Sequence, residues 1–384
     1  MRTFTCYCGN RLYFENSRCL RCGRQTAFDP ESLVMSALEP QAEGTWLALS
    51  LPSDRCRVRL CQNTLDFDTC NWLVNKDSSH TYCLACRMNS VIPDLTKPRR
   101  VALWFKVEQA KRRLLFTLLS LRVPVLTKQQ NPTTGLAFQI LADERLDADS
   151  IDADTHNQVT TGHYFGCITI NLMEADDSIR EQMRERMNES YRTLLGHFRH
   201  ESGHYYWFLL VDNSPWLEPF RALFGDERAD YAEALASHHA GEEEGSDWQK
   251  QYISRYATTH PWEDFGETWA HYLHIVDTLE TAWDANFEIE GQRLNSPLEQ
   301  EPLQYGLGLN RESALQAESF PSFLEDWFVL SAALNRLNRS MGLPDAYPFV
   351  LSKKAIQKLT FVDQLVRQAA LPVLFPESPL DRSD

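Results

Sequence analysis

Nine of the ten cysteines in this 384-residue chain lie before residue 87, and most of them form closely spaced pairs. In a reducing compartment such pairs are more often metal ligands than disulfide partners. A segment this short between two pairs cannot bury much core, so a bound metal would supply much of its folding free energy. The cysteines therefore predict a metal-stabilised N-terminal region, which we place at residues 1–97.

The first two cysteine pairs are each followed by a glycine, Gly9 and Gly23. Two tight turns of this kind can bring four thiolates around one tetrahedral Zn²⁺. The glycine lets the backbone N–H groups of each turn point toward the sulfurs. We therefore expect a zinc ribbon at about residues 1–28, and its predicted ligands are Cys6, Cys8, Cys19 and Cys22.

A second structural site is expected around the later pair Cys83 and Cys86. Cys56 is a candidate partner, but it lies in an alternating stretch typical of a strand with the thiol packed inward. His80 could also replace a cysteine, although it lies in a polar loop. The remaining two cysteines are nearer to the pair. The predicted ligands of this site, at about residues 45–92, are Cys61, Cys70, Cys83 and Cys86.

Length and charge limit the possible partners. The chain is long enough for two or three domains, and its net charge of −15 makes nucleic acid an unlikely partner for the whole molecule. The apolar stretch 114–126 is interrupted by Arg122 and is too short to span a membrane. The first residues contain no apolar signal-peptide core. We expect a cytoplasmic protein without a membrane partner.

The sharpest motif is H-E-x-x-H, formed by His200, Glu201 and His204. On a helix, histidines four residues apart share a face and can hold one Zn²⁺. Glu201 then lies beside the metal, where its carboxylate can take a proton from an activated water. His197 lies outside this pair and is expected to be structural. The motif predicts a hydrolytic zinc site.

A hydrolytic zinc needs a third protein ligand and an open fourth position. His260 followed by Pro261 predicts the start of a helix on which Glu263, Glu267 and His271 recur every four residues on one face. One of them can complete the coordination while a neighbour accepts a hydrogen bond from a ligand histidine. The spacing alone leaves the choice among them open.

The segment from Tyr256 to Glu267 resembles the Y-x-x-x-x-x-x-E-x-x-x-E pattern of the gluzincin metallopeptidases in the anthrax lethal factor and Mlc titration factor A group. The resemblance implies Glu263 as third ligand, Glu267 as the acid that orients a histidine, and Tyr256 as the phenol that stabilises the oxyanion. His271, two turns beyond Glu263, would then be a packing residue or a support for the ligands. The group often has alanine in place of Gly266, a change expected to leave these roles intact.

Nearly end to end, the chain resembles predicted bacterial zinc-binding metallopeptidases with an N-terminal zinc ribbon. This implies an α+β fold in which the ribbon modules precede a mainly helical zincin-like domain, residues 98–384, with a small β-sheet and a C-terminal helical part. In this class the strand before the zinc helix usually presents an open edge to an extended peptide. The candidate edge residues are Thr169, Ile170 and Asn171, and a buried central strand is the alternative.

The expected function is hydrolysis of peptide bonds with one catalytic and one or two structural zinc ions. The ribbons would dock the peptide or protein substrate or a protein partner. The alternative is a ribbon module that binds protein or nucleic acid, attached to a non-catalytic zincin scaffold. Glu201 favours catalysis, because a scaffold needs no carboxylate beside the metal. Since the catalytic ligands all follow residue 199, a chain beginning near Lys97 is expected to fold and bind one zinc.

Overall fold

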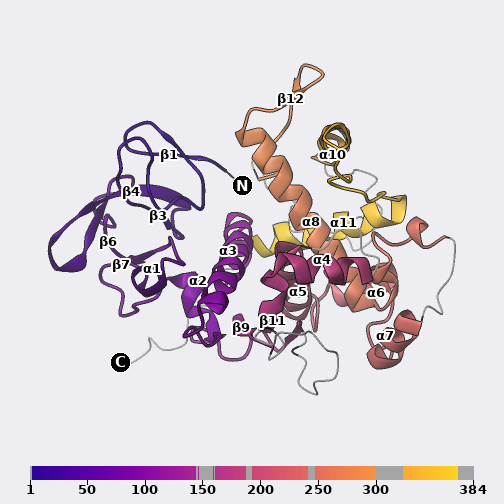
Figure 1. The fold of residues 1–384 in the computed structure, drawn as a ribbon. Coiled ribbons are helices and arrows are strands. Elements are labelled where there is room, and N and C mark those ends of the chain that lie inside the picture. Colours follow the sequence, from indigo (N-terminus) through magenta and orange to yellow (C-terminus); the bar gives the residue numbers. More distant parts are fainter. Residues whose placement is uncertain are drawn as a thin grey trace, which may run out of the picture.

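The structure is a computed structural model that describes residues 2–143, 146, 159, 161–186, 193–240, 247–298 and 323–370. Short strands dominate the first part of the chain and helices dominate the rest (Figure 1). The predicted α+β organisation, with a cysteine-rich region before a helical domain, is confirmed. None of the helices in these ranges is long and apolar enough to cross a membrane.

The cysteine-rich region contains a small hairpin and a five-stranded antiparallel sheet whose strands follow chain order. Apolar side chains of this sheet, among them Leu38 and Val58, form a small buried cluster. Two short helices follow strands of this region. The elements are β1 (Phe4–Thr5), β2 (Arg11–Leu12), β3 (Thr26–Asp29), β4 (Val34–Pro40), β5 (Trp46–Ala48), β6 (Arg57–Leu60), α1 (Gln62–Phe67), β7 (Leu73–Asn75) and α2 (Leu84–Arg87).

A second sheet joins the two parts of the chain. Its strand order is β10 (Gly162–Tyr164), β11 (Cys167–Asn171), β9 (Ala137–Leu141) and β8 (Asn89–Val91). β8 precedes residue 97, yet it pairs in parallel with β9. The cysteine-rich region thus supplies an outer strand to the sheet of the following domain. This arrangement argues against the expectation that a chain beginning near Lys97 folds by itself.

The strand β11, which precedes the helix that carries His200 and His204, does not have the predicted open edge. Thr169, Ile170 and Asn171 lie on β11, which pairs with β10 on one side and with β9 on the other. Ile170 is fully buried. The alternative of a buried central strand is therefore the observed one, and β10 is the strand at this side of the sheet in the described part of the chain.

The helices α5 and α8 pack against each other and carry the candidate metal site. Thr193 caps α5 by accepting a hydrogen bond from the Gly196 N–H, and His260 caps α8 by accepting one from the Trp262 N–H. Pro261 begins α8, as predicted, because its missing N–H needs no partner there. The helices are α3 (Pro98–Ser120), α4 (Asp177–Arg186), α5 (Leu194–Leu210), α6 (Leu217–Phe224), α7 (Tyr231–Ala240), α8 (Pro261–Asp284), α10 (Phe323–Ser340) and α11 (Lys353–Ala370).

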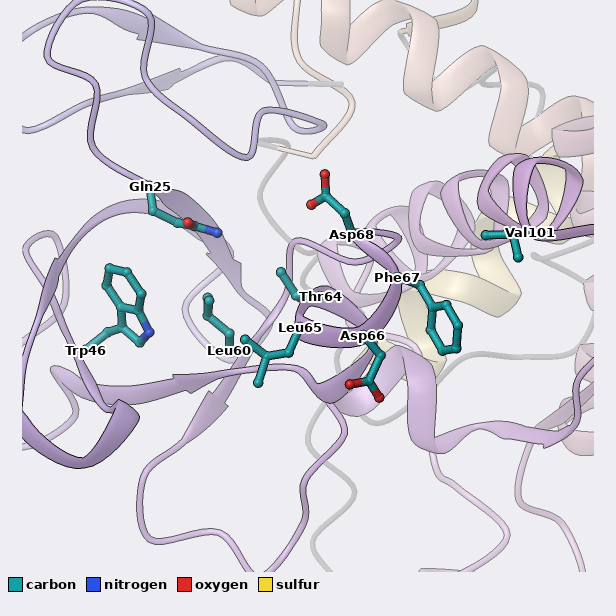
Figure 2. A pocket seen from close by; sticks show the side chains of 9 residues that line it. All are labelled: Gln25, Trp46, Leu60, Thr64, Leu65, Asp66, Phe67, Asp68 and Val101. Carbon is teal, nitrogen blue, oxygen red and sulfur yellow. The ribbon is translucent and has the colours of Figure 1, made fainter. Parts of the chain in front are cut away.

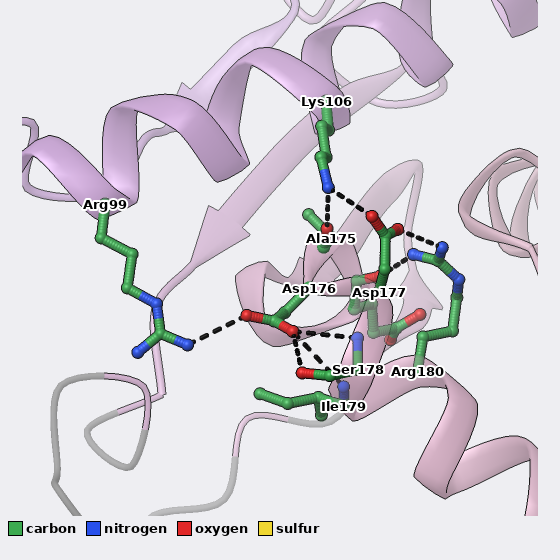
Figure 3. A network of polar contacts seen from close by, with 9 residues as sticks. Arg99, Lys106, Ala175, Asp176, Asp177, Ser178, Ile179 and Arg180 are labelled. Carbon is green, nitrogen blue, oxygen red and sulfur yellow. Dashed lines mark hydrogen bonds and ion pairs between the residues drawn. The ribbon is translucent and has the colours of Figure 1, made fainter.

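Ion pairs fasten α3 to the segment that follows β11 (Figure 3). Arg99 pairs with Asp176 at 2.9 Å, and Lys106 pairs with Asp177 at 2.8 Å. Hydrogen bonds from Ser178, the exposed guanidinium of Arg99 and backbone N–H groups lower the pKa of Asp176 to about 2, although partial burial opposes the shift. The network holds the end of the sheet against α3, on which α5 also packs.

Candidate metal centres

The first cysteine cluster converges as the pairs predict. Its sulfurs lie within 4.8 Å of one another, and the Sγ atoms of Cys6 and Cys22 are 3.8 Å apart. Four sulfurs at a Zn–S bond length of ~2.3 Å in a tetrahedron would be about 3.8 Å apart. Gly9 and Gly23 have φ angles of 80° and 71°, which glycine adopts without strain. The backbone N–H of Cys22 lowers the pKa of Cys19 to about 6.

The second cluster combines four buried thiols. The sulfurs of Cys70 and Cys83 lie 3.6 Å apart, and those of Cys70 and Cys86 lie 3.8 Å apart. Burial opposes ionisation of Cys70, but hydrogen bonds with Cys83 and Cys86 and the charge of buried Arg112 on α3 lower its pKa. The cluster comprises the four cysteines expected from the sequence, Cys61, Cys70, Cys83 and Cys86.

The alternative ligands of the second cluster lie elsewhere. Cys56 Sγ donates a hydrogen bond to the Ser53 carbonyl at 3.2 Å. The His80 carbonyl accepts a hydrogen bond from Arg59 in the loop before Cys83. None of the ten cysteines forms a disulfide. Both cysteine clusters therefore offer complete four-thiol donor sets.

A third group lies between α5 and α8. The Nε2 atoms of His200 and His204 are 3.1 Å apart, and Glu263 Oε2 lies 2.9 Å and 3.6 Å from them. Three donors bound to Zn²⁺ at ~2.0–2.1 Å in a tetrahedron would lie about 3.3 Å apart. The donor set of two imidazoles and one carboxylate, arranged in this way, fits a zinc ion with one open position.

Glu267 holds the outer side of the His200 ring. Its Oε1 lies 2.8 Å from His200 Nδ1, and its Oε2 accepts a hydrogen bond from Ser254 Oγ at 2.5 Å. A carboxylate on the far nitrogen fixes the tautomer and orientation of a ligand imidazole. His271 packs away from the ligand histidines, because its Nδ1 is 2.8 Å from the Tyr347 hydroxyl and its ring lies against Phe349.

His200, Glu263 and Glu267 strongly influence one another's ionisation. Burial favours the neutral ring of His200, but the carboxylates of Glu263 and Glu267 raise the pKa of this histidine well above its ordinary value. Burial also opposes ionisation of Glu263, yet hydrogen bonds with His200 and His204 lower its pKa. Burial also opposes ionisation of Glu267, but the hydrogen bond with His200 outweighs burial and lowers the pKa of Glu267 to about 2. The two carboxylates thus favour a positive charge at His200. A bound Zn²⁺ would supply this charge in place of the proton.

Glu201 and Tyr256 complete the predicted catalytic groups. Glu201 is buried, and its Oε2 has no hydrogen-bond partner among the described residues. A buried carboxylate oxygen without a partner is costly in an apolar surrounding, so a water or ligand is expected to contact it. The Tyr256 ring lies 5.8 Å from the His200 ring. Burial, reinforced by Glu263, raises the pKa of Tyr256, which stays protonated and able to donate.

Two groups near the site were not predicted. The Tyr231 hydroxyl donates to Glu263 Oε1 at 2.6 Å, and Ser254 contacts Glu267. Tyr231 lies within a segment that carries the family resemblance, but no spacing rule links it to a helix that begins 30 residues later. His197 pairs with Glu174, away from the His200 and His204 donors, which agrees with a structural role.

A separate cavity of about 640 Å³ lies in the cysteine-rich region (Figure 2). Trp46, Leu60 and Leu65 give it apolar walls, while Asp66 and Asp68 supply carboxylates. The cavity contains none of the three donor groups. It is therefore a surface distinct from the histidine site.

Comparison with known proteins identifies the family of the chain. The model of a family described as "Putative zinc-binding metallo-peptidase" matches residues 100–365, and a zinc-ribbon domain model matches residues 3–97. The chain belongs to this metallopeptidase family. Uncharacterised proteins of Mycobacterium tuberculosis and Mycobacterium bovis are 40% identical to it over 373 residues, which cover 96% of each chain. No solved structure matches.

Proposed function

We propose that this chain is a zinc-dependent metallopeptidase of the gluzincin type with a zincin-like catalytic domain. The observation that carries the proposal is the convergence of His200, His204 and Glu263 beside Glu201, whose Oε2 is buried without a partner. Two imidazoles and a carboxylate are the ligand set of a hydrolytic zinc with an open position. A purely structural zinc would have no use for Glu201.

Each residue has a separate chemical role in this proposal. When bound, zinc polarises the peptide carbonyl and lowers the pKa of a water to about 7. Glu201 accepts the proton of the attacking water and passes it to the leaving amine. The protonated hydroxyl of Tyr256 donates to the oxygen that gains negative charge. Glu267 keeps the His200 ring in its ligand orientation.

The cysteine-rich region is proposed to dock a protein substrate or partner, with one zinc in each of its two clusters. Its cavity has apolar walls and carboxylates, so it suits a segment with apolar and basic side chains. Acidic walls also disfavour nucleic acid. The ten free cysteines suit a cytoplasmic location, where thiols stay reduced.

The decisive experiment compares new protein termini in cells that express the wild-type chain or Glu201→Gln. The glutamine can bind water but cannot take its proton, so cleavage products should disappear while bound zinc remains. Glu218→Gln, which changes an exposed side chain on α6, is the matched control and should cleave like the wild type. Identical termini with wild type and Glu201→Gln would reject hydrolysis and favour the ribbon-module alternative.

A further inference from the structure

Tyr231 divides the two oxygens of the Glu263 carboxylate between different partners. Its hydroxyl donates to Oε1 at 2.6 Å. The other oxygen, Oε2, faces the histidines at 2.9 Å from His200 Nε2 and 3.6 Å from His204 Nε2. One oxygen is therefore held by a phenol, and the other is turned toward the donor group.

The start of α8 holds the Tyr231 ring in place. The ring packs against His260 and Trp262 with centroid distances of 5.3 Å and 6.3 Å. His260 also binds the segment before α7, because its Nε2 donates to the Ala229 carbonyl at 3.2 Å. The residues that place Tyr231 thus belong to the same helix turn as Glu263. Their contacts couple the position of the phenol to that of the carboxylate.

We propose that Tyr231 is a positioning residue that keeps Glu263 as a one-oxygen ligand of zinc. A hydrogen bond to Oε1 opposes rotation of the carboxylate and its binding through both oxygens, so the open position stays available. The inference rests on the proposed zinc site.

The same arrangement recurs at Glu267, which supports a positioning role. One oxygen of Glu267 contacts His200, and the other accepts a hydrogen bond from Ser254. Glu263 and Glu267 therefore each have one oxygen toward the histidines and one oxygen on a hydroxyl. Tyr256 differs, because its proposed partner is the substrate, and its side chain also hydrogen-bonds with Tyr231.

The test measures zinc per chain of the full-length protein dialysed against buffers of fixed free zinc. His204→Ala removes one donor, so the zinc-binding step that this variant loses belongs to the histidine site. Tyr231→Phe removes only the hydroxyl and should weaken this step about 10–100-fold, with rescue by excess zinc. Tyr272→Phe is the matched control. It removes a different phenol, on α8, that donates to Asp363 at 3.0 Å, and should bind zinc like the wild type.

The outcomes separate this inference from the proposed function. If Tyr231→Phe binds zinc as tightly as the wild type, Tyr231 does not position Glu263. The inference is also overturned if zinc-saturated Tyr231→Phe melts well below the wild type and releases all its zinc together, because the defect is then in folding. Equal zinc content in wild type and His204→Ala would instead show that the histidine group does not bind zinc.

Discussion

Gly203 on α5 faces Gly266 on α8 so closely that a Cβ atom on Gly203 would lie 2.9 Å from the Gly266 Cα. A Cβ atom on Gly266 would in turn lie 3.0 Å from Cε1 of His200. The two glycines let the helix of the histidines approach the helix of Glu263. Alanine at Gly266 would require the His200 ring to shift by a few tenths of an ångström, and with glycine at this position no such shift is needed.

Gly203→Ala should therefore separate α5 from α8. The added methyl meets backbone and the Cβ of Trp269, which cannot move aside as a flexible side chain could. Overpacking of this kind costs about 1–3 kcal/mol, and the histidine site should bind zinc more weakly. Thermal unfolding and zinc affinity measure both effects. Gly162→Ala, with nothing within 4 Å of the new atom, is the control. Equal stability of the two variants would contradict the prediction.

Cys83→Ser should remove one zinc ion and destabilise the whole chain. The second cluster packs into the continuous apolar core that also contains Leu114 of α3 and Phe198 of α5. Zinc content per chain and the melting temperature measure the loss. Cys56→Ser lies outside both clusters and should retain the wild-type zinc content. The assignment of the cluster is wrong if both variants hold equal zinc.

A chain beginning at residue 98 should fail to fold, in contrast to the expectation from the sequence. It lacks β8, and it leaves the buried pair Glu108 and Lys111 of α3 without Asn89, which binds both side chains. Unpaired buried charges are strongly destabilising. Soluble yield and bound zinc are the measurements. Recovery of a folded fragment with one zinc would show that the catalytic region is independent.

The parts of the site that follow local geometry could be predicted from the sequence. His200 and His204 share a helix face through their spacing, and the cysteine pairs with their glycines form turns that are equally local. The start of α8 at Pro261 was also predictable, because proline suits only the first helical turn. Such features depend on few residues and need no knowledge of distant contacts.

Contacts between distant segments could not be predicted in this way. The sequence of β11 suits a central strand as well as an edge strand, and only its pairing with β10 and β9 decides between them. Tyr231 reaches Glu263 across 32 positions, with no periodic pattern to connect them. The coupling of the ribbon region to the catalytic sheet likewise depends on β8, a strand of three residues.

His274 should make stability depend on pH below about 6.5. It is half-buried on α8 against Trp327 and Tyr347. Burial, with the charges of Arg199 and His271, lowers the pKa of His274 well below 6.5. The unfolded chain then binds a proton that the folded chain does not, so this contribution to stability is present above pH 6.5 and is lost as the pH falls.

Replacement by glutamine removes this titration. The free energy of unfolding, measured with urea from about pH 7 to about pH 5, should fall less steeply in His274→Gln. One proton changes the slope by at most about 1.4 kcal/mol per pH unit. Equal slopes in the two proteins would show that His274 does not titrate differently on unfolding.

Glu263 and Glu267 on α8 should be separable by their zinc dependence. Glu263→Ala removes the charged oxygen that lies 2.9 Å from His200 Nε2, so the histidine site should lose zinc and activity together. Glu267→Ala removes only the acceptor at His200 Nδ1. Its zinc affinity should fall about 10–100-fold, and excess zinc should restore part of the activity. If Glu263→Ala holds zinc normally while Glu267→Ala loses it, the third ligand lies one turn further along the helix, and Tyr231 would then hold an acid that does not bind the metal.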